Sequence, residues 1–378
     1  MPFKLKSILT NVFRYYNRKR RRALRKKRLL QNDVKFKNNH SIPKLPSCVM
    51  LISTSKGWGD SLYVAGFAKR LKKWGVYNVL IAAPSCIIEH FDNPIFDGIY
   101  ELDDICLSNI RSRKIDLIVD LTYINLSYYK ERLMLIQQLQ CAAITVCEES
   151  KYINTYSHFV NYSLRSHISN RMALILEQIT QEKQAPIYPL VFFDEHDSKT
   201  ISRLIIEKFS HSIGSIAYLN TVARDSDRCF SIEQICALSK VLLNYFSIVI
   251  VNAESDIIID DCEERVFLLP SITFKELCAL ISKVSFVVTP DTAVTHIASC
   301  LDVPSFVVFP PNDRDYWKQY PAKECWGSLS SKSLTYSIDD ADLIIDRWGY
   351  ANHSSRACSS YNPSSLAYDL NRFIRTLK

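Results

Sequence analysis

The chain has 378 residues, of which 47% are hydrophobic and 23% are charged. This composition is that of a soluble globular protein and excludes an intrinsically disordered one, and the length suits two domains with connecting segments. No stretch approaches the roughly 18 uncharged apolar residues of a membrane-spanning helix. The N-terminus also lacks the apolar core and small-residue cleavage site of a secretory leader.

The net charge of +8 comes from one end of the chain. Residues 1–30 contain twelve Lys or Arg and no Asp or Glu, whereas the other 348 residues contain 35 basic and 39 acidic side chains. Apolar residues recur at helical spacing in the same segment, at Leu5, Ile8, Leu9, Val12, Phe13 and Tyr16. We interpret residues 1–40 as a basic amphipathic tail that binds an anionic membrane surface. A solvated charged tail and a nucleic-acid-binding segment are the alternatives.

The twelve cysteines are scattered along the chain, and no two form a Cys-x-x-Cys pair. Cys236, Cys278 and Cys300 lie in apolar helical patterns, where cysteine behaves as a small hydrophobic residue. We therefore expect reduced thiols in a cytoplasmic protein and not a disulfide framework.

The first half of the chain alternates predicted strands and helices after a proline-bearing linker, Ser41 to Pro46. The predicted strands are Cys48–Ile52, Val79–Ala82, Ile115–Leu121 and Ala142–Val146, and the predicted helices are Leu62–Trp74 and Tyr129–Gln140. This alternation predicts a parallel sheet. The residues from Ser150 to Leu190 show no clear pattern, and Pro186 and Pro189 mark the expected domain crossing.

The second half repeats the alternation. Helices are predicted at Lys199–Phe209, Ser231–Tyr245, Phe274–Ile281 and Ala293–Leu301, and strands at Ser215–Leu219, Ile248–Val251, Arg265–Leu268, Phe286–Val288 and Ser305–Phe309. Ser231 and Thr273 are suited to cap the helices that follow them. The signal weakens after Trp326, although Pro363–Leu377 is predicted to form a closing helix. The pattern as a whole predicts two doubly wound α/β domains.

A polar turn follows the first predicted strand and contains Lys56, Gly57, Trp58, Gly59, Asp60 and Ser61. Its glycines allow a tight turn and a close approach to a ligand, and Asp60 falls at or near the N-cap of the next helix. Asp60 is therefore either a helix cap or a reactive carboxylate. Because Leu62 stands third after Gly59, the motif is neither the dinucleotide-binding Gly-x-Gly-x-x-Gly nor a P-loop, and hydride transfer and NTP hydrolysis are unsupported.

A second polar turn, Thr289 to Thr292, links a predicted strand to a predicted helix. Ligands bind at this end of strands in open parallel sheets, and a helix N-terminus offers N–H groups to an anion, so we expect the turn to hold the phosphates of a nucleotide. The carboxylate of Asp291 would repel a phosphate, so it shapes the turn or accepts hydrogen bonds from ligand hydroxyls. His296, one turn into the helix, is either a packed residue or a ligand-binding one.

Together the two turns resemble glycosyltransferase family 9, the bacterial heptosyltransferases of lipopolysaccharide core assembly. The similar motifs are Gly57 to Leu62, Leu219-Asn220, Asp227 to Ser231, Pro270 to Leu277, Val288 to Ala298 and Leu301 to Asp313. The resemblance covers about residues 48–325, and its most specific part is the Asp-Thr-x-x-x-His block from Asp291 to His296.

The resemblance implies a GT-B architecture, with two Rossmann-like domains facing each other across a cleft. By position, Asp60 is the expected general base, with a pKa raised by partial burial, and Lys56, Gly57, Trp58, Gly59 and Ser61 form the acceptor-side loop. Thr292, Ala293 and Arg228 are expected to hold the donor diphosphate, with Asn220, Asp291 and His296 beside them and Glu254 on the ribose. The family implies no cofactor and no metal.

The sequence departs from the family at several of these positions. Ala293 and Pro310 stand where the family has Gly, Phe230-Ser231 stands for Trp-Pro, and Arg228 stands for a phosphate-binding Lys. Arg keeps the positive charge of Lys but carries it on a planar guanidinium instead of a compact ammonium group. The chain is therefore identified as a divergent member.

The resemblance implies an inverting, metal-independent transferase that moves heptose from ADP-L-glycero-D-manno-heptose to a lipid-linked lipopolysaccharide acceptor. The basic tail suits a cytoplasmic enzyme peripheral to the inner membrane. The alternatives are another nucleotide sugar, a protein acceptor, or a non-catalytic nucleotide- or nucleic-acid-binding module. We expect a tail at 1–40, an acceptor domain at 41–190, a donor domain at 191–335 and a closing segment at 336–378.

Overall fold

The structure, a computed structural model, describes residue 24 and residues 36–55, 57–102, 110, 113–122, 128–146, 154–163, 166–209, 214–252, 263–310, 322–337 and 357–377. Almost all of the predicted basic tail lies outside the described residues, as do Lys56, Glu254 and the segment from Pro311 to Asp313. The predictions made for them therefore stay predictions.

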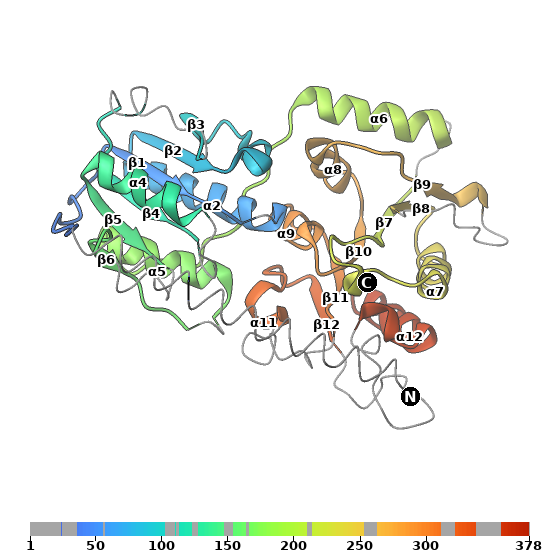
Figure 1. Ribbon diagram of the computed structural model, residues 1–378. Helices are drawn as coiled ribbons and strands as arrows, with labels where there is room; N and C mark the ends of the chain where they lie inside the picture. The colour runs from blue at the N-terminus through green and yellow to red at the C-terminus, as the bar shows by residue number, and fades with distance from the viewer. Residues whose placement is uncertain are drawn as a thin grey trace, which may run out of the picture. The chain divides into compact units, whose positions relative to one another are not determined.

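The chain divides into two compact units (Figure 1). Unit 1 contains the described residues before position 57, together with those in 68–162 and 174–184. Unit 2 contains 57–67, 163–173 and the chain from 185 onward. Helices α2 (Trp58–Trp74) and α5 (Ile168–Thr180) consequently have residues in both units, and the first turns of α2 belong to unit 2.

Unit 1 is built on a sheet of six parallel strands in the order β3-β2-β1-β4-β5-β6. The strands are β1 (Cys48–Ile52), β2 (Asn78–Ala83), β3 (Gly98–Glu101), β4 (Leu117–Asp120), β5 (Ala142–Thr145) and β6 (His158–Phe159). This is the strand order of a doubly wound Rossmann sheet, in which the winding direction reverses between β1 and β4.

The central strands of unit 1 are buried along their whole length, which explains why their sequences are continuous apolar runs instead of alternating ones. Side chains of α4 (Tyr129–Leu139), including Leu133 and Ile136, pack with Met50 of β1 and Ile118 of β4 in one hydrophobic cluster. A short 3₁₀ helix, Ser85–Phe91, follows β2.

Unit 2 repeats the same winding. Its six parallel strands lie in the order β12-β11-β10-β7-β8-β9, so the direction reverses between β7 and β10. The strands are β7 (Ile216–Asn220), β8 (Ile248–Asn252), β9 (Val266–Leu268), β10 (Phe286–Pro290), β11 (Ser305–Val308) and β12 (Ser333–Tyr336). The predicted α/β fold with two doubly wound Rossmann-like parts is confirmed.

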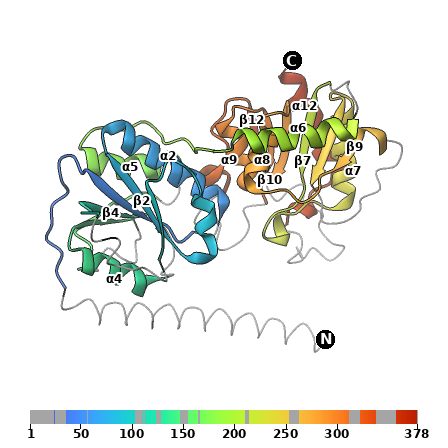
Figure 2. The same cartoon turned by 90° about the horizontal axis from the view of Figure 1, so that it is seen from above.

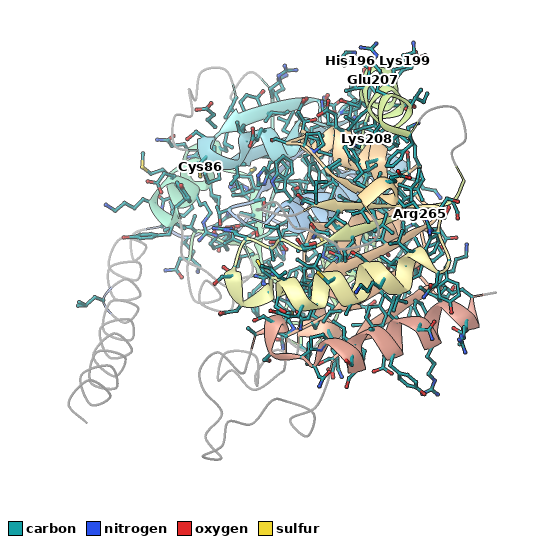
Figure 3. All side chains as sticks on the ribbon, turned by 90° about the vertical axis from the view of Figure 1, so that its right-hand side faces the viewer. Cys86, His196, Lys199, Glu207, Lys208 and Arg265 are labelled. Carbon is teal, nitrogen blue, oxygen red and sulfur yellow. The ribbon has the colours of Figure 1, made fainter. Side chains whose placement is uncertain are left out.

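Helices cover both faces of the unit 2 sheet. On one face, α7 (Ile232–Leu243) and α12 (Pro363–Thr376) lie side by side (Figure 3) and pack against side chains such as Leu219, Val288 and Val308. On the other face, α6 (Glu195–Phe209), α8 (Phe274–Ile281) and α9 (Ala293–Cys300) pack against Tyr218 and Val287. Helix α6 lies along α8 (Figure 2).

Local signals explain several helix starts. Ser231 and Gln234 form a capping box at α7, and Thr273 and Glu276 form another at α8, as the sequence predicts for both caps. At the other end of α7, Arg265 donates hydrogen bonds to the carbonyls of Leu243 (2.7 Å), Phe246 (2.6 Å) and Ser247 (3.0 Å). Figure 3 labels Arg265 near this helix.

Among the α-helices and strands in the described part of the chain, the sequence patterns missed five: β3, β6, β12, α5 and α11 (Ala322–Trp326). The strands among them have only two to four residues, too few for periodicity to establish. Helix α5 lies in the stretch from Ser150 to Leu190 that showed no clear pattern.

All cysteines in the described ranges are free thiols. Among the described helices, none is both long enough and apolar enough to cross a membrane.

Candidate active site

The polar residues of the second predicted turn lie where the winding of the unit 2 sheet reverses. Asn220 ends β7 and Pro290 ends β10, and these two strands are direct neighbours. The connections after them leave toward opposite faces of the sheet, and ligands bind at such a reversal point. The structure therefore places Asn220, Asp291 and Thr292 together at the edge where a nucleotide is expected.

Asn220 organises this edge through its side-chain amide. Its Nδ2 donates to Oγ1 of Thr289 (3.0 Å) and of Thr292 (3.2 Å), and to the carbonyl of Val222 (3.2 Å). Its Oδ1 accepts from Nδ2 of Asn252 at 3.2 Å. Asn220 is 3% exposed, so this network fixes the strand ends from within.

Thr292 caps α9, the eight-residue helix that follows the turn. Its backbone is extended, and its Oγ1 accepts from the N–H of Val294 at 3.3 Å. The N-terminus of α9 carries a partial positive charge directed at the site. Ala293 is the first residue of this helix, and its methyl group lies at the position where the sequence resemblance implies glycine.

Arg228 supplies the cation of the site. It ends the 3₁₀ turn Ser226–Arg228, and its Nη1 donates to the backbone O (3.0 Å) and to Oδ2 (3.3 Å) of Asp291. Its Nη2 donates to Oδ2 of Asp225 at 2.6 Å. Burial by itself would lower the pKa of Arg228, but Asp291 and Asp225 raise it above its usual value. Arg228 is therefore a fixed, permanent cation at the turn.

Asp291 is nearly enclosed, with 7% of its surface exposed. Burial raises its pKa to about 6, Arg228 opposes this shift, and the negative charges of Asp60 and Asp225 add to it. Its carboxylate is directed at Arg228, which supports the interpretation that Asp291 shapes the turn.

Asp60 lies inside α2 and not at its N-cap, which corrects the predicted helix start. The helix begins at Trp58, four residues before the predicted Leu62, because the N–H groups of Asp60 (3.1 Å) and Ser61 (3.4 Å) already bond to the carbonyl of Gly57. Oγ of Ser61 also donates to the carbonyl of Trp58 at 2.7 Å. Asp60 is half-buried in the first turn, where a helix N-terminus favours a carboxylate.

Within unit 2, the start of α2 packs against α8 and α9. Gly59 lies against the ring of His296, and the ring of Trp58 stacks on Phe274 with centroids 3.9 Å apart. Asp60 is close enough to Asp291 to raise its pKa. Residues from both predicted turns thus come together in one unit.

Unit 1 contains a buried polar cluster that the sequence did not reveal. Oδ2 of Asp120, at the end of β4, accepts from Nη1 of Arg132 (2.7 Å) and from the hydroxyl of Tyr156 (2.5 Å), while Oδ1 accepts from the N–H of Thr122 (3.1 Å). Asp120 and Arg132 are 0% and 1% exposed. The available signal was a carboxylate within an otherwise apolar strand pattern.

Among the described residues, no group of three or more His, Cys, Asp or Glu side chains is arranged to hold a metal ion. A groove of about 470 Å³ lies between α7 and α12, lined by residues that include Tyr245, Tyr368 and Arg375. It shares no residue with the predicted site.

Comparison with known proteins supports the resemblance. The sequence model of glycosyltransferase family 9 (heptosyltransferase) matches residues 250–335, which include β10, the turn with Asp291 and Thr292, and α9. No curated protein has a sequence that matches this chain.

Several solved structures share the fold. A glycosyl transferase family 9 protein from Veillonella parvula DSM 2008 has a TM-score of 0.65 at 10% identity, over 89% of this chain and 99% of the other. An E. coli ADP-heptose lps heptosyltransferase II has a TM-score of 0.59 at 13% identity, over 88% and 99%. The E. coli heptosyltransferase WaaC with ADP-2-deoxy-2-fluoro heptose has a TM-score of 0.53 at 12% identity, over 88% and 100%.

Proposed function

We propose that this chain is a divergent member of glycosyltransferase family 9, whose sequence model matches residues 250–335, and that it is an inverting, metal-independent heptosyltransferase that uses ADP-L-glycero-D-manno-heptose and a lipopolysaccharide inner-core acceptor. The observation that supports this most is Arg228 beside the start of α9, at the reversal point of the unit 2 sheet. A cation and a helix N-terminus suit a diphosphate that gains negative charge as it leaves. The similar E. coli structures named for ADP-heptose support the choice of donor.

The donor half of the proposed site consists of Arg228, Thr292 and the first N–H groups of α9, which hold the diphosphate. Asn220 keeps the Thr292 side chain in place through its hydrogen bond. Asp291 and His296 lie beside this turn, and Glu254, outside the described residues, is proposed for the ribose hydroxyls. The methyl group of Ala293 hinders the approach of the diphosphate to the backbone N–H groups at the start of α9. We therefore expect the hydrogen bonds from these groups to be longer than with glycine at this position.

The reaction is a single displacement at the anomeric carbon. An acceptor hydroxyl oxygen forms the new bond to this carbon, its proton passes to the carboxylate of Asp60, and the bond to the diphosphate oxygen breaks as ADP leaves. Attack opposite the leaving group inverts the configuration. The charge that develops on ADP is stabilised by Arg228 and the α9 N-terminus.

On the acceptor side, we propose that Lys56 and Gly57, together with Trp58, Gly59 and Ser61 in the first turn of α2, contact the acceptor beside Asp60. A lipid-linked acceptor requires the enzyme to work at a membrane surface. The basic residues of 1–30 suit an anionic inner leaflet, with about 1 kcal/mol of attraction per cation. This proposal makes the enzyme cytoplasmic and peripheral to the inner membrane.

Transfer of another nucleotide-linked sugar, or transfer to a protein, is the alternative within the enzyme class. A nucleotide-binding module without catalysis is the alternative outside it. Comparison of nucleoside diphosphates separates the donor possibilities: ADP should raise the melting temperature more than UDP or GDP. A larger shift with UDP would exclude heptose as the donor sugar.

The direct test is a transfer assay with ADP-heptose and a heptose-deficient lipopolysaccharide acceptor. The wild-type protein should form the glycosylated acceptor, and Asp60→Asn should lower the rate at least 100-fold while its stability stays within about 1 kcal/mol. Glu195→Gln, at an exposed carboxylate of α6, is the matched control and should keep the rate. Full activity of Asp60→Asn would show that Asp60 is not the base.

A further inference from the structure

We propose that His296 is a positioning residue, whose ring supports the backbone of Gly59 and thereby fixes the carboxylate of Asp60 beside the donor turn. This inference rests on the proposed role of Asp60. It gives His296 a different task from the donor contact that the family resemblance implies.

The contact between Gly59 and His296 is too close for any other residue at position 59. A Cβ atom built on Gly59 would lie 2.5 Å from Cδ2 and 3.1 Å from Nε2 of His296, and 3.7 Å from Cα of Ala293. A carbon atom at 2.5 Å overlaps the ring, so only glycine permits this approach. The backbone immediately before Asp60 therefore lies directly against α9.

The His296 ring is itself held firmly. It is 4% exposed, and the fully buried Tyr63 meets it edge to face, with centroids 5.1 Å apart and an interplanar angle of 75°. Nδ1 of His296 has no hydrogen-bond partner among the described residues, so packing sets the ring position. Burial, and next the neighbouring His167, lower the pKa of His296 to about 3. The ring is therefore neutral at pH 7 and adds no positive charge for a phosphate.

A second contact fixes the residue before Gly59. Trp58 stacks on Phe274 with ring centroids 3.9 Å apart and 22° between the planes. Phe274 is the first residue of α8, whose N-terminus is fixed by the capping box of Thr273. Both residues preceding Asp60 are thus anchored to helices of unit 2.

A double-mutant cycle tests the contact. Gly59→Ala should lower kcat at least tenfold, because the added methyl group displaces the Asp60 turn, while KM for the donor changes less than threefold. His296→Ala removes the atoms that the methyl group would meet. The double variant Gly59→Ala/His296→Ala should therefore recover at least threefold in kcat over Gly59→Ala, although it carries one more substitution.

Unfolding free energy gives a readout that does not depend on activity. The destabilisation caused by Gly59→Ala should be at least halved in the His296→Ala background. Gly98→Ala is the control, because its Cβ would lie 3.0 Å from Cε2 of Tyr100 and not near His296. Its effect should be the same in both backgrounds.

Additive effects of Gly59→Ala and His296→Ala on both kcat and unfolding would overturn the proposal. So would a tenfold weaker affinity of His296→Ala for ADP with kcat unchanged, since His296 would then bind the donor. If the wild-type protein transferred no sugar, the proposed function would fail, and the unfolding cycle would still decide whether Gly59 and His296 are coupled.

Discussion

Arg228 binds Asp291 at two points, the backbone carbonyl at 3.0 Å and the carboxylate at 3.3 Å, across 63 positions of sequence. The bond to the carbonyl fixes the turn before α9, and the bond to the carboxylate compensates a buried negative charge. The same guanidinium also binds Asp225. A planar guanidinium with several donors makes all three contacts, which a single lysine ammonium would match less well.

Arg228→Ala is expected to weaken ADP binding by about 10- to 100-fold, because hydrogen bonds between charged groups contribute about 1.5–3 kcal/mol. Arg228→Lys should fall between this variant and the wild type, because a single ammonium cannot hold Asp225, Asp291 and a phosphate together. Calorimetric titration with ADP measures both. An unchanged dissociation constant in Arg228→Ala would remove Arg228 from the donor site.

The raised pKa of Asp291 predicts a specific pH dependence of stability. With a pKa of about 6 in the folded protein and 3.8 as the reference value, the folded state binds more protons than the unfolded state between about pH 4 and pH 6. Stability contributed by this group is therefore greatest in acid and falls as the pH rises through this window. At about 1.4 kcal/mol per pH unit, the total change is on the order of 3 kcal/mol.

Asp291→Asn should abolish that contribution. The difference in unfolding free energy between the variant and the wild type, measured by urea denaturation from pH 4 to pH 7.5, should increase in favour of the variant as the pH rises. Taking the difference cancels the titration of other groups. A difference that stayed constant with pH would mean that Asp291 titrates alike in the folded and unfolded chains.

Thr292→Ala should lower the unfolding free energy by about 1 kcal/mol through loss of the α9 cap. The loss also deprives Nδ2 of Asn220 of one acceptor. Thr292→Ser keeps the hydroxyl oxygen and should stay within about 0.5 kcal/mol of the wild type. Thermal denaturation of the two variants makes the comparison, and equal losses would show that the methyl group and not the hydroxyl stabilises the turn.

The Asp120–Arg132 pair predicts strong, non-additive effects on the stability of unit 1. Arg132→Met leaves a buried carboxylate without its cation and should cost about 3–5 kcal/mol. Asp120→Asn/Arg132→Met removes both charges and should cost clearly less than the single change. Urea unfolding provides the measurement, and a loss below about 1 kcal/mol for Arg132→Met would show that water or another group compensates Asp120.

Local sequence signals were sufficient for much of the fold. Ser231 and Thr273 are typical N-cap residues that mark the starts of α7 and α8, and the structure confirms both caps. The buried central strands have continuous apolar sequences, so β1 was predicted with its observed bounds. The turn before α9 was also located from its polar residues, although β10 runs two residues further than predicted, to Pro290, and leaves only Asp291 and Thr292 between strand and helix.

Contacts between distant residues explain what was missed. The segment Gly57 to Asp60 has a composition typical of a loop. In the structure, its last three residues instead form the first turn of α2, where Trp58 contacts Phe274 and Gly59 contacts His296. Asp120 and Arg132 lie 12 positions apart, on β4 and α4, and nothing local in the sequence indicates that they pair. Asp225, likewise, gave no sign of a role until the structure brought it to Arg228.

The division of α2 between the two units has a consequence for dissecting the protein. Leu62 belongs to the same hydrophobic cluster as Val294 and Ile297 of α9, and its carbonyl accepts the N–H of Leu190 at 2.9 Å. A recombinant fragment starting near residue 185 would contain the whole unit 2 sheet but not this leucine. The apolar residues of α9 that pack against Leu62 would then face solvent and promote aggregation, so a stable unit 2 fragment requires the first turns of α2 to be supplied as well.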